Sequence, residues 1–217
     1  MTTKPKKISA KGESTRQKIL AAALEVIATS GLRAVTHRSV AAAAGVQLSL
    51  TTYYFKDLNE LLIEAFTSFC NAGRPGYEKT WEKVNAAAAQ VDRKSLKSRA
   101  GQEQLAEALA EIGTDHILRN IRTRPMELAV EQQLLNELRL TPELAKVAEE
   151  YMEKLIEPLR TMVLELGSTA PETDAQLLMS VMLKLEHEGL ANPRSRKLKG
   201  QVFTLLQRQI RWVLAGL

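Results

Sequence analysis

Apolar residues recur three and four positions apart along almost the whole chain, which is the spacing of amphipathic helices. The first predicted helix runs from residue 15 to about residue 30, with Ser14 and Gln17 placed to cap its start and Gly31 to end it. Its single apolar stripe consists of Ile19, Leu20, Ala23, Leu24 and Ile27. The two-residue alternation of strands is absent, so the pattern predicts an all-α protein.

Two short helices follow the first one. Thr36 is a candidate N-cap for the second helix, which Gly45 ends after about two turns. The third helix fits residues 48–54, and the small side chains at 41–44 suit a close crossing of helices. Two short helices joined by a tight turn behind a longer one form a helix-turn-helix.

Helical spacing continues to the C-terminus. Asp57 and Glu60 predict a capped fourth helix that ends at the GRPG sequence of residues 73–76, where Pro75 interrupts the hydrogen-bond ladder. Pro158 predicts a kink inside a long helix. Beyond the break, a segment at 92–101 reads as a loop, and helices are expected near residues 77–91, 102–120, 124–139, 142–167, 172–190 and 196–215.

Composition agrees with a globular helical protein. The chain has 217 residues, of which 45% are hydrophobic and 25% are charged. The single cysteine, Cys70, allows no internal disulfide, which fits a reducing compartment. The N-terminus lacks the apolar segment of a secretory signal and no run is long enough to span a membrane, so a cytoplasmic protein is expected.

Positive charge is concentrated at the N-terminal end. Residues 1–56 contain nine lysines and arginines but only two glutamates, whereas the rest of the chain is net negative. This asymmetry is typical of a polyanion-binding module joined to a neutral or acidic body, although a solubilising basic tail gives the same count. Lys4, Lys6, Lys7 and Lys11 form the proposed arm, which we expect to follow the backbone or minor groove of DNA.

The sequence shows no recognisable catalytic, cofactor or metal motif. His37, His116 and His187 are far apart, and the second histidine of the H-E-x-x-H zinc motif is missing after Glu188. Phosphate-binding and nucleophile-elbow glycine motifs are also absent. We therefore expect neither enzyme activity nor a cofactor, while an all-helical enzyme or adaptor with a site assembled from distant residues stays an alternative.

The predicted third helix has the side chains that a DNA-reading helix needs. Gln47 can pair with adenine, Leu48 can meet a thymine methyl group, and the Tyr53 hydroxyl can reach a phosphate. Tyr54 and Phe55 are more suited to packing in the core. The complete set of predicted DNA-binding residues is Thr36, His37, Arg38, Gln47, Leu48, Ser49, Thr51, Thr52, Tyr53 and Lys56.

The motifs THRSVAAAAGV, TYYF and KDLNELL, at their spacing in this chain, resemble the DNA-binding domain of the TetR family of bacterial transcriptional regulators. The resemblance covers about residues 15–65. The chain departs from the usual pattern at three positions, with Ser49 in place of a glycine, Thr52 in place of a tyrosine and Leu58 in place of a lysine. These departures concern individual DNA contacts and the operator sequence rather than the fold.

The resemblance implies about nine helices, a C-terminal domain that binds a small molecule, and a homodimer formed by the last two helices. It divides the chain into a flexible arm at 1–14, the DNA-binding domain at 15–56 and the ligand-binding and dimerisation domain at 57–217. Apolar stripes support the dimer, although they also fit the protein's own core. The stripes comprise Leu177, Leu178, Val181, Met182 and Leu185, and then Val202, Phe203, Leu206, Ile210, Val213 and Leu214.

Candidate ligand-binding residues are aromatic, methionine, cysteine and histidine side chains of the C-terminal part, which also fit an ordinary core. They are Phe66, Phe69, Cys70, Tyr77, Trp81, His116, Met126, Met152, Met179 and Met182. Glu186 and His187 offer a polar end to such a pocket or surface positions.

Three hypotheses follow from the residues and the resemblance. The first is a dimeric repressor that a small molecule releases from a pseudo-palindromic operator, through a shift of the fourth helix that separates the two reading heads. The second is an architectural or localisation protein with the same DNA-binding head and no inducer. The third is a helical enzyme or adaptor that does not bind DNA. A DNA affinity that falls steeply as salt rises is not expected for it.

Overall fold

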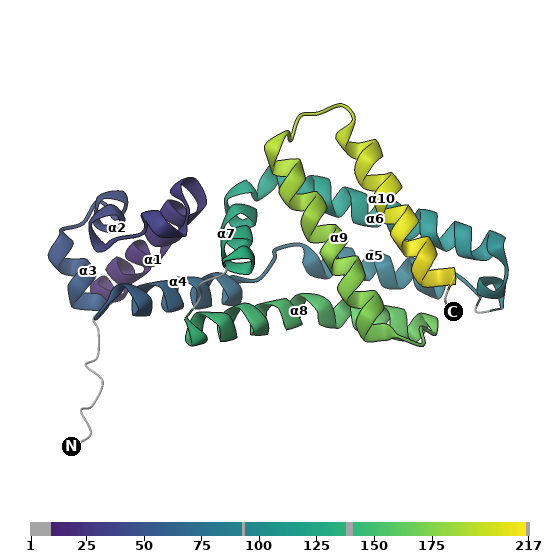
Figure 1. Cartoon of the computed structure of the whole chain (residues 1–217), viewed down its shortest axis with the longest axis horizontal. Helices are drawn as coiled ribbons and strands as arrows, with labels where there is room; N and C mark the ends of the chain where they lie inside the picture. The colour runs from purple at the N-terminus through teal and green to yellow at the C-terminus, as the bar shows by residue number, and fades with distance from the viewer. Residues whose placement is uncertain (1–9, 93, 138–140, 216–217) are drawn as a thin grey trace, which may run out of the picture. The chain divides into compact units, whose positions relative to one another are not determined.

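The computed structural model describes residues 10–92, 94–137 and 141–215, which form helices and their connections without any strand (Figure 1). The first helices are α1 (Ala10–Ser30), η1 (Leu32–Ala34), α2 (His37–Ala44), α3 (Leu48–Tyr54), α4 (Leu58–Ala72) and α5 (Tyr77–Ala89). The others are η2 (Ser95–Lys97), α6 (Arg99–Thr123), α7 (Pro125–Asn136), α8 (Pro142–Leu166), α9 (Pro171–Ala191) and α10 (Leu198–Ala215). The all-α prediction is confirmed, with ten α-helices in the described residues rather than the nine expected.

The first helix begins earlier than predicted. Ser14 lies inside α1 instead of capping it, and the Gln17 side chain donates a hydrogen bond to Glu13 at 2.9 Å. Residues 10–14 of the expected arm, including Lys11, are therefore helical. Lys4, Lys6 and Lys7 lie outside the described residues.

The expected loop at 92–101 contains a 3₁₀ turn and the start of α6. The Ser98 side chain accepts a hydrogen bond from Gly101 N at 3.1 Å, which caps the helix at Arg99. A Cβ atom at Gly101 would lie 2.2 Å from the Ser95 carbonyl oxygen, so this turn requires glycine. Helix α8 includes Pro158 within its bounds.

The described chain divides into two compact units. The first comprises residues 1–73 together with 129–148, and the second comprises 74–128 together with 149–217. Helix α4 thus groups with the helix-turn-helix rather than with the C-terminal part, where the sequence placed it. The division falls at the predicted GRPG break between α4 and α5.

The core of the first unit forms behind the two short helices. Ile19, Ile27, Val40, Phe55 and Leu61 from four successive segments are all excluded from solvent. Of the four alanines at 41–44, only Ala41 is buried, so the close crossing depends on one of them rather than on the whole run.

A late segment of the chain completes this unit. The Leu32 amide donates to Gln133 Oε1 at 3.4 Å, and the Thr141 hydroxyl donates to Asn59 Oδ1 at 3.1 Å. Leu134 and Leu144 from the same segment are buried. This late segment therefore contributes to the core of the first unit, which contains the helix-turn-helix and is called the head below. Helical spacing alone did not indicate this grouping.

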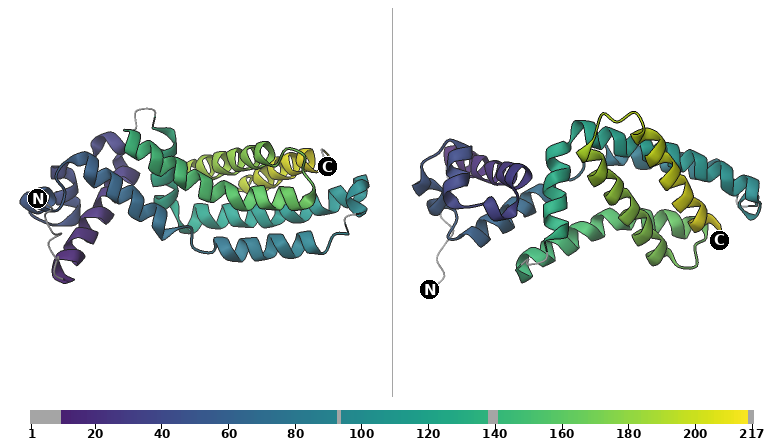
Figure 2. Two further views of the ribbon diagram at one scale, coloured as in Figure 1. Left: turned by 90° about the horizontal axis from the view of Figure 1, so that it is seen from below. Right: turned by 45° about the horizontal axis from the view of Figure 1, so that its top comes forward.

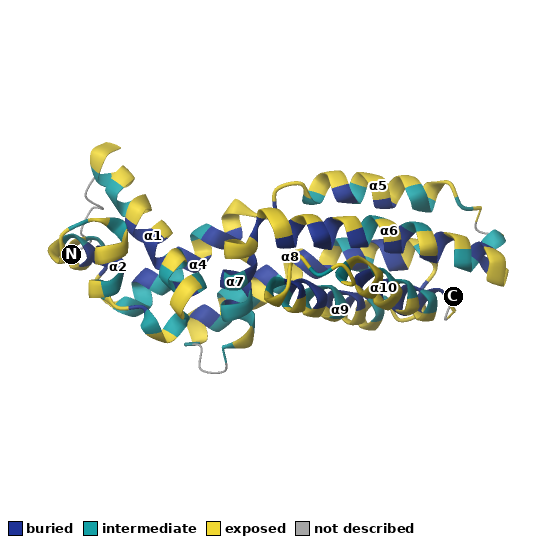
Figure 3. Ribbon diagram, turned by 90° about the horizontal axis from the view of Figure 1, so that it is seen from above, coloured by how far each residue is buried: buried dark blue, intermediate teal, exposed yellow. Residues whose placement is uncertain are grey.

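Helix α6 forms the centre of the second unit and packs against α5, α9 and α10 (Figure 2). Its buried residues occur along nearly its full length, whereas α5 buries only Thr80 and Val84 (Figure 3). Leu105, Leu109 and Ile117 of α6 belong to the apolar core of this unit. Within the described residues, no helix is both apolar and long enough to cross a bilayer.

Candidate nucleic-acid interface and ligand cavity

Reciprocal hydrogen bonds fix the start of α2. Thr36 Oγ1 accepts from the Ser39 amide at 3.0 Å, while Ser39 Oγ accepts from the Thr36 amide at 2.9 Å. This capping box satisfies two amides that the helix leaves free. The N-cap role predicted for Thr36 is confirmed, and its hydroxyl is already engaged with Ser39.

The turn between α2 and α3 depends on Gly45. Gly45 has φ 62° and ψ 37°, in the left-handed region, and its amide bonds to Ala42 O at 3.2 Å. The Val46 amide bonds to Ala41 O at 3.0 Å, which completes a Schellman motif. The motif ends α2 sharply and lets α3 begin at Leu48 after Gln47.

One face of α3 is exposed along its whole length. Tyr53 is 65% exposed and Leu48 is 45% exposed, although both are large side chains that usually pack inside. Gln47, Ser49 and Thr52 are also exposed. Five of the predicted contact residues thus share the accessible side of the short helix.

Thr51 corrects the predicted set of DNA contacts. Its side chain is fully buried, and its hydroxyl donates to the Leu48 carbonyl at 2.7 Å. It lies on the opposite side of α3 from the exposed residues, where it contributes to the head's core. Phe55 is also fully buried and Tyr54 is partly buried, as expected for residues that attach α3 to the head.

The remaining predicted contact residues flank this surface. Arg38 and Lys56 are exposed, whereas His37 is half-buried at the start of α2. The buried His37 Nδ1 has no hydrogen-bond partner among the described residues. Arg38 and Lys56 supply positive charge next to α3, which suits contact with phosphates.

The segment after α3 is fixed to both α4 and α1. Asp57 Oδ1 accepts from the Glu60 amide at 2.9 Å, which confirms the predicted cap of α4. Arg16 of α1 forms an ion pair with Glu64 of α4, and its guanidinium lies 5.6 Å from the centre of the Phe55 ring. No motif in the sequence indicated Arg16, which connects α1 to Phe55 at the end of α3.

An apolar cavity of about 60 Å³ lies inside the second unit. Four of the predicted ligand residues line it, namely Tyr77, Trp81, His116 and Met182. The other lining residues are Thr80, Val84, Leu109, Gly113, Leu159, Met162, Leu178, Leu206 and Ile210. The rings of Tyr77 and Trp81 meet edge to face with centroids 5.9 Å apart.

The other six predicted ligand residues are not among the cavity's lining residues. Phe66, Phe69 and Cys70 are core residues of the first unit, because α4 groups with the helix-turn-helix. Met126 is exposed, Met152 is half-buried, and Met179 is buried without lining the cavity. Helical spacing identified apolar faces but did not show which of them meet around a cavity.

His116 is the polar centre of a buried hydrogen-bond network. Asn120 Nδ2 donates to Glu186 Oε1 at 2.7 Å and lies 3.0 Å from His116 Nε2. An amide nitrogen can only donate, so Nε2 accepts and the ring proton is on Nδ1. His116 Nδ1 then donates to Thr80 Oγ1 at 2.9 Å, and the Thr80 hydroxyl donates to Gly76 O at 3.2 Å.

Burial, together with the nearby positive charges of Arg74, Arg119 and Arg124, lowers the pKa of His116 to about 3. Arg119 Nη2 lies 2.9 Å from Thr80 Oγ1 and 3.1 Å from His116 Nδ1. With Nδ1 protonated, the guanidinium donates to Thr80. The ring is therefore neutral at physiological pH.

Glu186 supplies the negative charge of this network. Its carboxylate is completely buried and accepts from Arg74 Nη2 at 3.1 Å as well as from Asn120. Arg74, Thr80, Arg119 and Asn120 were not predicted from the sequence, since they come from two helices and a loop and share no motif. His116 and Glu186 were the members of this cluster that the sequence indicated, and Glu186 joins it through Asn120 and Arg74.

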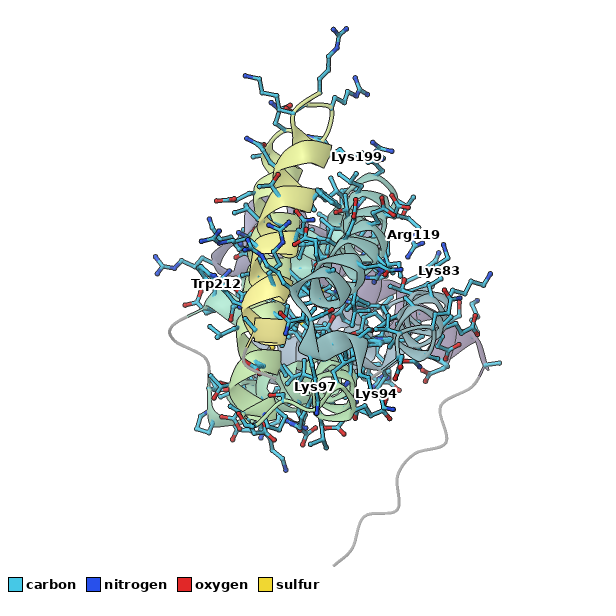
Figure 4. All side chains as sticks on the ribbon, turned by 90° about the vertical axis from the view of Figure 1, so that its right-hand side faces the viewer. Lys83, Lys94, Lys97, Arg119, Lys199 and Trp212 are labelled. Carbon is cyan, nitrogen blue, oxygen red and sulfur yellow. The ribbon has the colours of Figure 1, made fainter. Side chains whose placement is uncertain are left out.

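The apolar stripes predicted for dimerisation are mostly inside the protomer. Leu178 and Leu185 of α9 are buried, as are Val202, Leu206, Ile210, Val213 and Leu214 of α10. Leu177 of the predicted stripe is exposed, and so are Leu205 and Trp212, which were not part of it. Figure 4 shows Trp212 on the outer side of α10, with Arg119 on the opposite side of that helix.

Residues 19–65 match the family model for bacterial regulatory proteins of the tetR family. Their capped α2, glycine turn and exposed α3 define a helix-turn-helix DNA-binding protein. Residues 19–65 therefore form a DNA-binding domain of the TetR type. No curated protein matches the sequence.

Solved structures share the fold along nearly the whole chain. A transcriptional regulator from Rhodococcus sp. Rha1 is 21% identical with a TM-score of 0.62, over 93% of this chain and 96% of that one. NalD, the secondary repressor of the MexAB-OprM multidrug efflux pump in Pseudomonas aeruginosa, is 20% identical with a TM-score of 0.59, over 94% and 97%. The multidrug binding protein EbrR complexed with proflavin is 25% identical with a TM-score of 0.53, over 90% and 99%.

Proposed function

We propose that this protein is a dimeric repressor that binds a pseudo-palindromic operator and leaves it when a small molecule binds the second unit. The observation that supports DNA reading most directly is the exposed face of α3 on a capped helix-turn-helix. Gln47, Ser49 and Thr52 offer hydrogen-bonding groups to bases or phosphates, and Leu48 offers an apolar contact to a thymine methyl group. Tyr53 provides a hydroxyl for a phosphate at the edge of the groove.

Dimerisation involves the exposed parts of α9 and α10. Leu205 and Trp212 lie about two turns apart on the same side of α10 and are 48% and 60% exposed. Exposed large apolar side chains at helical spacing favour a partner helix. A two-fold dimer places two α3 helices on half-sites about 34–36 Å apart, so that two short helices together read an operator.

The basic arm strengthens binding without much sequence preference. Lys4, Lys6 and Lys7 precede α1, and Lys11 lies in its first turns. Their charges release counterions when they approach phosphates, a contribution that decreases steeply with salt. Removal of residues 2–11 should lower affinity for all duplexes and reduce the salt slope.

Ligand release is supported by the cavity and by the described activities of similar proteins. NalD is a repressor and EbrR is a multidrug binding protein. In this chain, a ligand among α5, α6, α8, α9 and α10 acts on DNA binding by displacing α8, whose first residues belong to the first unit. Helix α8 contributes Leu144 to the first unit and Leu159 to the second, and α4 follows α3 after a short turn. Such coupling requires that the ligand bind the two arrangements with different affinities.

One observation favours a second candidate, an architectural or localisation protein of the same fold without an inducer. The cavity of about 60 Å³ is far smaller than the roughly 300–1,000 Å³ of typical ligand sites. A ligand must then displace side chains such as Met162 and Met182, whose flexible thioethers make this feasible. If every ligand that binds leaves operator affinity unchanged, the second candidate replaces the first.

The decisive experiment is selection of bound sequences from a random duplex library at two salt concentrations. A two-fold symmetric motif that persists at the higher salt is the expected result, and it supplies the operator for ligand screening. Enrichment of single half-sites would contradict the dimer. Weak binding that disappears at higher salt without enrichment would refute sequence-specific regulation.

A further inference from the structure

The groups available at the polar end of the cavity are hydrogen-bond donors. Arg119 donates to Thr80, which lines the cavity, and its side chain also borders a surface groove with Asp115, Arg122 and Lys199. Trp81 lines the same cavity, and its buried indole N–H has no acceptor among the described residues. A buried donor without an acceptor costs about 1–3 kcal/mol, which a ligand oxygen can recover. The cavity therefore favours a ligand that accepts hydrogen bonds.

The charges around this end are predominantly positive. Arg74, Arg119 and Arg124 all lie close enough to His116 to oppose its protonation. The Glu186 carboxylate is already bonded to Arg74 and Asn120, and His116 itself is neutral. No carboxylate is among the residues that line the cavity, so the ammonium group of a cationic ligand would meet donors and like charge there.

We propose that the cavity binds a short apolar carboxylate. Its hydrocarbon part packs among Leu109, Leu159, Met162, Met182 and Ile210. Its carboxylate accepts hydrogen bonds from Arg119, which does not line the cavity itself but lies behind the lining residue Thr80 at 2.9 Å. Arg119 is exposed on its other side, so the carboxylate forms a charge-assisted bond without complete dehydration. The inference rests on the proposed ligand-responsive function and specifies the chemical class of its effector.

The test uses three compounds with the same hydrocarbon length: hexanoate, hexanamide and hexylamine. Calorimetric titration of the full-length protein at pH 7.5 should give hexanoate the highest affinity, with hexylamine at least about tenfold weaker, a difference of about 1.4 kcal/mol. In a Trp212→Phe variant, hexanoate should change the fluorescence of the remaining Trp81. Tighter binding of hexylamine than of hexanoate would overturn the proposal, and so would absence of hexanoate binding.

Arg119→Gln provides the residue-specific test. It should weaken hexanoate about tenfold and leave hexanamide within about twofold, since only the anion depends on the guanidinium charge. The matched control is Arg122→Gln on the same helix, which removes a neighbouring surface charge that has no described contact with Thr80 or His116. Equal effects of the two variants on hexanoate would show nonspecific attraction and contradict the proposal.

These outcomes are separable from failure of the proposed repressor mechanism. Binding is measured without DNA, so hexanoate that binds through Arg119 but leaves operator affinity unchanged supports the ligand class and refutes ligand release. A carboxylate series that does not bind, together with another compound that releases the operator, refutes the ligand class and leaves the repressor mechanism intact.

Discussion

Arg74 and Glu186 are 112 positions apart in the sequence, yet Arg74 Nη2 lies 3.1 Å from Glu186 Oε2 with both side chains buried. Burying two charges is costly, and only a paired and hydrogen-bonded arrangement offsets that cost. Asn120 supplies a further donor to Glu186 and connects the pair to His116. The pair therefore fixes the position of the polar end of the cavity.

Removing one member of the pair should destabilise the protein strongly. Glu186→Gln removes the buried carboxylate charge that pairs with Arg74, and we expect a loss of about 3–5 kcal/mol in the free energy of unfolding. Urea denaturation measures this loss. Glu103→Gln, which interrupts a half-exposed pair with Arg211, is the control and should cost at most about 1 kcal/mol. A loss for Glu186→Gln as small as that of the control would contradict the role of the pair.

The stability of the protein should decrease in mild acid because of His116. Its pKa is about 3 in the folded protein and about 6.5 in the unfolded chain, so between these pH values only the unfolded chain binds the proton. Stability is then lost as pH falls below about 6.5, with a limiting slope of roughly 1.4 kcal/mol per pH unit. The stability advantage of the wild type over His116→Gln should shrink between pH 7 and pH 5.5. Nitrogen NMR should show a neutral ring with its proton on Nδ1 throughout, and protonation near pH 6.5 would contradict this assignment.

Two glycine-to-alanine changes should have opposite signs. Gly45→Ala places a Cβ in a left-handed conformation with no atom within 4 Å, so backbone strain alone should cost about 1 kcal/mol. Gly200→Ala lies in α10, also in open space, and should stabilise the helix by up to about 1 kcal/mol. Thermal unfolding distinguishes them. If both variants shifted the melting temperature equally and in the same direction, the left-handed conformation of Gly45 would not be what ends α2.

Substitutions in α3 should separate sequence reading from attachment to DNA. Gln47→Ala should reduce discrimination at one base position by about 1–3 kcal/mol, while Tyr53→Phe should weaken all duplexes similarly because it removes the proposed phosphate contact. Competition binding with operator variants measures both effects. Thr51→Val is the control on the buried side of the same helix and should leave base preference unchanged. A changed preference in Thr51→Val would show that α3 reads DNA with another face.

Charge introduced on the exposed side of α10 should prevent dimer formation. Leu205→Glu places a carboxylate in the proposed apolar contact, where it would be buried without a partner. Sedimentation should then show a monomer with weaker operator binding. Leu164→Glu, at a position 58% exposed on α8, is the control and should remain dimeric. Dimers of both variants at low concentration would exclude α10 from the interface.

Local sequence determined the helix-turn-helix almost completely. Thr36, Gly45 and Asp57 act within a few residues of themselves, so their capping and turn roles followed from residue type and spacing. The exposure of Gln47 and Tyr53 was predicted as well, because a short helix between two fixed turns has one free side. The burial of Thr51 was not predicted, since it depends on the packing of α3 against other helices.

Only the tertiary structure decided which helices share a core and where buried charges meet. Helical periodicity marked Phe66 and Met182 equally as ligand candidates, but α4 belongs to the head and α9 to the cavity. The same periodicity grouped Leu206 with the dimer stripe, although it is buried in its own unit. Arg74, Asn120 and Glu186 come together through packing of segments far apart in the chain, and period and spacing contain no information on such long-range contacts.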